Sequence, residues 1–108
     1  MELTLYMRTL LEEEHTVAEV LQTFREYANS GASISLRSVK SVLEKYALSE
    51  KELEKAREIL TDGILFHLRE YITGDNENEL KESKEYEKAV VYINNKLPES
   101  RRIQFFTE

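Results

Sequence analysis

Apolar residues recur at helical spacing along most of this chain. In the first segment Leu3, Leu10, Val17 and Phe24 lie seven residues apart, like one seam of a heptad repeat. The segment 2–29 is therefore either one continuous helix or two helices. We favour a break at Glu14-His15, which would leave Leu3-Thr4-Leu5-Tyr6-Met7 able to form a short strand.

The reason for expecting a break is a capping box. Thr16-Val17-Ala18-Glu19 matches the pattern in which a threonine hydroxyl and a glutamate carboxylate bind backbone N–H groups reciprocally. Ser49-Glu50-Lys51-Glu52 is a second such box, and it opens the longest predicted helix, 49–72. Ser33 or Ser35 is expected to cap a short helix before it, and Asn76 to cap the last helix.

The few helix breakers mostly lie at expected helix ends. Gly31, Gly74 and Pro98 each follow an apolar-periodic segment, where glycine can end a helix and proline cannot continue one. Gly63 lies inside the longest segment instead. It predicts either a bend in that helix or the close approach of a neighbouring helix.

These elements predict an all-α fold, a small bundle of four to five helices in one domain spanning 1–108. The termini add an optional feature, a short two-stranded ribbon. The predicted core consists of Leu21, Phe24, Leu43, Leu60, Ile64, Leu68, Val90 and Ile93. The same leucine spacing would also suit a homodimer seam, so the oligomeric state stays open.

Composition narrows the class of protein. The chain has no cysteine, a formal net charge of −6 and 33% charged residues. A disulfide scaffold and a thiolate metal site are therefore excluded. Because no stretch is long and apolar enough for a signal peptide or a membrane span, we expect a cytoplasmic protein with no membrane partner.

Candidate catalytic residues are few. Glu12 and His15 have the spacing of di-iron ligands, but the second such pair is missing, so His15 is expected at the surface. His67 is expected to be a hydrogen-bonded core histidine. The acidic loop at Asp75 lacks the glycine and glutamate that a calcium loop requires. We therefore predict no enzyme activity, no metal and no cofactor.

A basic helix offers a candidate surface for nucleic acid. Residues 33–48 carry a net charge of +2 in an acidic chain. With the helix from Thr16 as its scaffold, the helix 35–46 resembles the recognition helix of a helix-turn-helix protein. The candidate DNA contacts are Arg37, Ser38, Lys40, Ser41 and Lys45. The loop before this helix is longer than the usual turn, and the overall acidity opposes phosphate binding.

The C-terminal segment 101–108 offers a candidate protein interface. Aromatic residues and arginine are enriched at interface hot spots. The candidate interface residues are Arg101, Arg102, Ile103, Phe105 and Phe106. The alternatives are that this tail completes the protein's own core or mediates self-association.

We therefore expect a non-enzymatic regulator, inhibitor or adaptor that binds a protein partner, with a homodimer as one option. A helix-turn-helix DNA-binding regulator is the first alternative. The second is an acidic nucleic-acid mimic, which the interleaving of lysines with glutamates disfavours.

Overall fold

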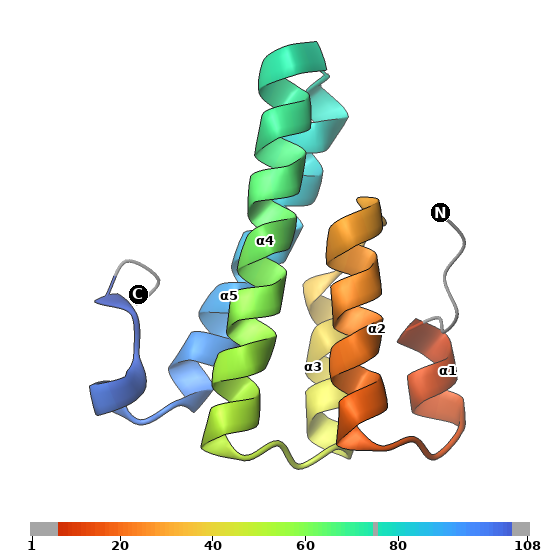
Figure 1. Cartoon of the computed structure of the whole chain (residues 1–108), viewed down its shortest axis with the longest axis vertical. Helices are drawn as coiled ribbons and strands as arrows, with labels where there is room; N and C mark the ends of the chain where they lie inside the picture. The colour runs from red at the N-terminus through yellow and green to blue at the C-terminus, as the bar shows by residue number, and fades with distance from the viewer. Residues whose placement is uncertain (1–6, 75, 105–108) are drawn as a thin grey trace.

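The computed structural model describes residues 7–74 and 76–104, and these residues form five α-helices and one 3₁₀ turn (Figure 1). The predicted all-α fold is confirmed. The elements are α1 (Met7–Glu12), α2 (Val17–Ser30), α3 (Leu36–Lys45), α4 (Glu50–Gly74), α5 (Glu77–Lys96) and η1 (Glu99–Arg101).

Each helix runs in the opposite direction to the one before it, with α2 and α4 at the front of Figure 1 and α3 and α5 behind them. The backbones of α4 and α5 approach each other over the greatest length, followed by those of α2 and α4. The 25 residues of α4 span about 37 Å. That length matches the longest dimension of the molecule, 38 Å, and α4 is the longest helix, as predicted.

The optional ribbon of the termini is not supported. Within the described ranges no residue is in a strand, and residues 99–101 form η1 instead. The other segments proposed for this ribbon, Leu3-Thr4-Leu5 and 105–108, lie outside the described residues.

The predicted break before α2 is confirmed. Thr16 is the N-cap in extended conformation, its N–H donates to Glu19 Oε1 at 2.9 Å, and the Glu19 N–H donates to Thr16 Oγ1 at 3.1 Å. The bond from the Thr16 N–H, followed by one from His15, lowers the pKa of Glu19. The capping box therefore ends the first segment and fixes where α2 begins.

A second set of contacts holds α1 to α3. Lys45 Nζ donates to the carbonyls of Leu10, Leu11 and Glu13 at 2.9, 3.1 and 2.7 Å. The Tyr46 hydroxyl donates to Leu10 O at 2.8 Å and accepts from the His15 N–H at 3.2 Å. These bonds satisfy carbonyls that the short helix α1 leaves open at its C-terminus.

His15 is therefore not the surface residue that the sequence predicted. Its side chain is only 12% exposed, because the segment that carries it is bound to Tyr46.

The core follows the predicted pattern with two differences. Six of the eight predicted core residues are buried, whereas Leu21 and Leu68 are only partly buried and pack against its edge. The buried face of α4 includes Leu53, Leu60 and Ile64, and also Gly63 and His67.

Gly63 allows a close approach between α4 and α5. A Cβ at this position would collide with the ring of Tyr86, which is fully buried. Of the two interpretations of Gly63, the structure therefore favours close packing. Burial in this contact also raises the pKa of the Tyr86 hydroxyl well above its usual value.

The other two glycines differ from each other. Gly31 ends α2 in the left-handed conformation (φ 73°) and also lies against the ring of Phe66. Gly74 is the last residue of α4, and nothing lies near its missing Cβ.

The first half of α5 carries many charges, yet it is anchored to α4. His67 is buried on α4, as expected, and its Nδ1 pairs with Glu79 Oε2 in the first turn of α5. Ser83, one turn further, is also buried. Contact with α4 therefore begins at the start of α5, before Tyr86.

Candidate functional site

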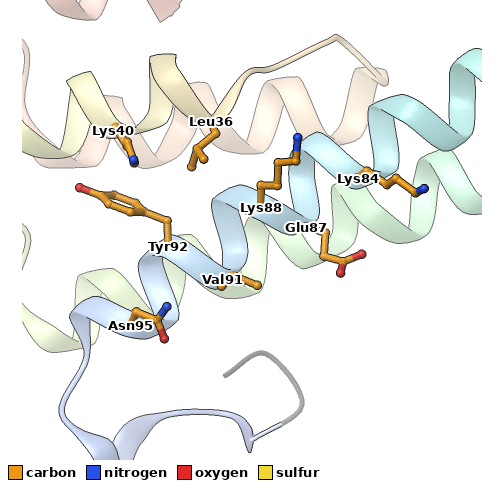
Figure 2. Close-up of a pocket in the computed structure, with 8 residues that line it drawn as sticks. All are labelled: Leu36, Lys40, Lys84, Glu87, Lys88, Val91, Tyr92 and Asn95. Atoms are coloured by element: carbon orange, nitrogen blue, oxygen red, sulfur yellow. The ribbon is translucent and has the colours of Figure 1, made fainter. Parts of the chain in front are cut away.

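A groove of about 460 Å³ lies between α3 and α5 in the described part of the molecule (Figure 2). Leu36, Val91 and Tyr92 supply its apolar floor. Its polar lining consists of Lys40, Lys84, Glu87, Lys88 and Asn95. It thus combines an apolar surface with a rim on which lysines outnumber carboxylates.

Tyr92 links the two helices that form this groove. It is partly buried against the core, and in Figure 2 it reaches from α5 toward Lys40 on α3. The ammonium groups of Lys40 and Lys96 each lie over its ring, 5.4 Å from the ring centroid. Two lysines from different helices are thus held beside one aromatic ring by cation–π attraction.

The lysines that line the groove, and Lys96 beside it, are incompletely neutralised. Lys88 pairs with Glu85 at 2.9 Å, and this contact is the main reason that the pKa of Glu85 is lowered. Within residues 7–74 and 76–104, Lys40, Lys84 and Lys96 have no ion-pair partner. The groove therefore carries positive charge that its own surroundings do not cancel.

The residues predicted to contact DNA differ in their positions and contacts. Lys40 lines the groove, whereas Lys45 lies at the other end of α3 and binds the carbonyls of α1. Ser38 belongs to the N-cap of α3, where its N–H donates to Ser35 Oγ at 3.2 Å. Arg37 is exposed and Ser41 is partly buried.

The scaffold expected for a recognition helix also differs. The closest neighbours of α3 are α5 and α1. The predicted partner, α2, is not among the helices that approach α3 most closely. The role of α3 in binding DNA stays a prediction that these positions do not strengthen.

The described part of the predicted tail interface is bound to its own chain. Arg101 pairs with Glu50 at 3.0 Å and with Glu54 at 2.8 Å. The Arg102 guanidinium donates to the carbonyls of Leu97 and Asn95 at 2.8 and 3.1 Å.

Ile103 is held by its backbone. Its N–H and carbonyl bind the side chain of the buried Asn94 at 2.9 and 3.0 Å, although 41% of the residue stays exposed. Phe105 and Phe106 lie outside the described residues. The contacts of residues 101–103 match the alternative in which the tail folds back onto its own chain.

The lysines of α5 were missed at the sequence level. Residues 73–100 carry a net charge of −3, which hid the presence of a basic face. The signal was the spacing of Lys84, Lys88, Tyr92 and Lys96, each four residues after the last, which places them along one ridge of a helix.

The described residues show no group of three or more His, Asp or Glu side chains that could hold a metal ion. None of their helices is both long and apolar enough to cross a membrane. The chain matches no protein-family model, and neither a curated protein nor a solved structure is significantly similar to it.

Proposed function

We propose that this protein is a non-enzymatic binding protein that takes an acidic, partly apolar segment of another protein into the groove between α3 and α5. The observation that carries the proposal is the groove itself, an apolar floor beside lysines that lack ion-pair partners. A regulator, inhibitor or adaptor would act through such a contact.

Charge complementarity is the first support. Lys84 and Lys88 lie four residues apart on one helix, a spacing at which like charges repel by a few tenths of a kcal/mol. Carboxylates of a partner would relieve this repulsion. On a chain with a net charge of −6, the groove is also a local exception that would guide an acidic segment to one place.

The apolar floor is the second support. Leu36, Val91 and Tyr92 offer hydrophobic area to a partner's side chain, and Tyr92 is the kind of residue that dominates interface energies. A surface meant only for phosphates would gain little from this floor. Glu87 in the lining would repel any anionic group close to it. Nucleic acid carries a phosphate at every nucleotide, whereas a protein segment can place a neutral or basic residue there, so we favour a protein segment over nucleic acid.

The test uses an acidic random copolymer of glutamate and tyrosine as the probe, with binding followed by fluorescence anisotropy at low salt. We expect the charge reversal Lys40→Glu/Lys84→Glu to weaken binding at least tenfold. Lys51→Glu/Lys55→Glu is the matched control, because both lysines are exposed on the first two turns of α4, outside the groove. This control should change binding less than threefold.

Two results would overturn the proposal. One is equal loss of copolymer binding in the groove variant and in the control, which would mean that net charge alone attracts the probe. The other is tighter binding of a single-stranded or duplex oligonucleotide than of the copolymer, which would favour the nucleic-acid alternative.

A further inference from the structure

We infer that the segment bound in the groove is an amphipathic acidic α-helix, laid along α5 with its acidic edge toward α3. The inference rests on the proposed function, because it names the form of the occupant of the same groove. Three features of the groove carry it: its two parallel ridges, its length, and the distribution of its charges.

The first feature is the shape of the α5 surface. Lys84, Lys88 and Tyr92 form one ridge of side chains four residues apart, and Lys96 extends it. Glu87, Val91 and Asn95 form a second ridge with the same spacing, beside the first (Figure 2). Two parallel ridges of this kind leave a furrow between them, and a ridge of another helix fits such a furrow.

The second feature is the length of the furrow. From Lys84 to Lys96 the helix rises about 18 Å, in steps of about 6 Å from one ridge position to the next. A helix laid beside α5 repeats its own side chains with the same step. An extended strand places same-face side chains about 7 Å apart, so its carboxylates would lie about 3 Å out of step with the lysines at the far end of this ridge.

The third feature is the asymmetry of charge across the furrow. Lys84, Lys88 and Lys96 lie on the ridge that Tyr92 shares, and Lys40 faces that ridge from α3. The opposite ridge carries Glu87. A bound helix therefore needs carboxylates on the edge facing α3, apolar residues against Val91 and Tyr92, and neutral or basic residues near Glu87.

These requirements define a probe. It is a fluorescein-labelled peptide of eighteen residues with glutamate at every fourth position, leucines on the adjacent ridge and glutamine or lysine beyond them. Its comparison peptide has the same composition in alternating polar and apolar order, which favours a strand. Anisotropy gives the affinities, and circular dichroism of the mixture reports helix formation.

We expect the helical peptide to bind at least tenfold more tightly than the alternating one, with a gain of helical signal on binding. Val91→Glu should remove this preference, because it places a carboxylate on the apolar floor. Leu65→Glu is the control, because Leu65 is exposed on α4 outside this groove and is 45% accessible. It should leave the preference intact.

The inference is overturned if the alternating peptide binds as tightly as the helical one, or if Val91→Glu and Leu65→Glu have equal effects. If the glutamate–tyrosine copolymer still depends on Lys40 and Lys84 in that case, the proposed function stands and only the helical form of the occupant is wrong. If copolymer binding does not depend on Lys40 and Lys84, both the proposed function and this inference are wrong.

Discussion

Two charged faces of this molecule lie on neighbouring helices, and they differ in how far their charges are paired within the chain. On α4 three carboxylates of the acidic face are paired with the chain's own arginines: Arg101 binds Glu50 and Glu54, and Arg25 binds Asp62 at 2.7 Å. The basic face of α5 and α3 has one internal ion pair, and three of its lysines have no ion-pair partner in the described ranges.

The difference separates charge used for folding from charge left for binding. The arginines that neutralise α4 come from α2 and from η1, so their ion pairs also hold segments distant in sequence in place. Among residues 7–74 and 76–104, the lysines of the groove form no ion pair with a carboxylate of another helix. Because an unneutralised cluster of like charges raises the free energy of the free protein, it is the face from which an anionic partner gains most.

Both faces depend on the close contact of α4 and α5, so the largest expected effect comes from breaking that contact. Gly63→Ala places a Cβ against the ring of the buried Tyr86. Overpacking of this kind costs about 1–3 kcal/mol, which exceeds the gain in helix propensity of at most about 1 kcal/mol. We expect a lower free energy of unfolding, measured by chemical denaturation.

Gly74→Ala is the matched control for this variant. Nothing lies near the missing Cβ of Gly74, so alanine there should stabilise the protein by a few tenths to about 1 kcal/mol. Equal stabilisation by both substitutions would show that α4 and α5 are not tightly packed at Gly63.

An effect of similar size concerns the C-terminal segment, whose Arg101 pairs with carboxylates of α4. Asn94→Ala removes the side chain that accepts from Arg57 at 2.8 Å and binds both backbone groups of Ile103. Buried groups left without partners cost about 1–3 kcal/mol, so we expect that loss of stability. Trypsin should also cleave faster after Arg101 and Arg102.

The neighbouring Asn95 provides the control. Its side chain is exposed, and it is the backbone carbonyl of Asn95 that accepts from Arg102. Asn95→Ala should therefore leave both stability and trypsin cleavage close to those of the unmodified chain. Unchanged cleavage in Asn94→Ala would mean that other contacts hold the tail.

A smaller effect is expected from one substitution on each face, and it compares the two faces directly. Arg101→Gln removes two partly exposed ion pairs and should lower the free energy of unfolding by up to about 1 kcal/mol. Lys84→Gln removes a lysine without a partner and should leave stability unchanged or raise it by a few tenths of a kcal/mol. Denaturation at low and high salt measures both, and the difference should shrink as salt screens the ion pairs.

The opposite order of stabilities, with Lys84→Gln the more damaging substitution, would contradict the distinction between the two faces. It would mean that Lys84 stabilises the fold instead of remaining available for a partner.

The smallest expected effect is on acid titration. The Lys88 ammonium is the main reason that the pKa of Glu85 lies below its ordinary value of 4.5. A carboxyl group with a lowered folded-state pKa stabilises the protein above its unfolded pKa, and this contribution is lost as the pH falls through the folded pKa. Lys88→Gln should therefore raise the pKa of Glu85 and reduce the loss of stability on acidification below about pH 5.

Carbon NMR of the Glu85 carboxyl during a pH titration measures this shift. Glu19 is an internal reference, because its lowered pKa comes from the capping box and should not respond to Lys88. The Leu36 N–H also donates to Glu85 Oε1, at 3.4 Å. A Glu85 pKa that is the same in both proteins would show that this bond, and not Lys88, is responsible.

The fold could be predicted where its causes are local. The capping residues Thr16, Ser49 and Asn76 act within a few residues of themselves, so the starts of three helices followed from short patterns. Periodicity also identified six buried core residues correctly. The choice between the two interpretations of Gly63 required Tyr86, which another helix supplies, and no local pattern names that partner.

The candidate groove was less accessible to prediction. Lys40 was singled out because its own segment is basic, but Lys84 and Lys88 were not, since net charge over a segment averages all faces of a helix. The bonds of Lys45 to α1 and of Asn94 to Ile103 depend on how helices are placed in space. Spacing along α5 could reveal its basic ridge, whereas only the fold brings Lys40 beside that ridge.

The contact between Tyr86 and Gly63 also bears on how the chain acquires its structure. Among the closest helix pairs, α4 and α5 are the only two that follow each other directly in the described chain; the other close pairs each skip one helix. Contacts that close short loops form with the smallest loss of chain entropy. We therefore expect the α4–α5 hairpin to assemble before the other helices dock, and the amides around Gly63 to exchange their hydrogens with solvent most slowly.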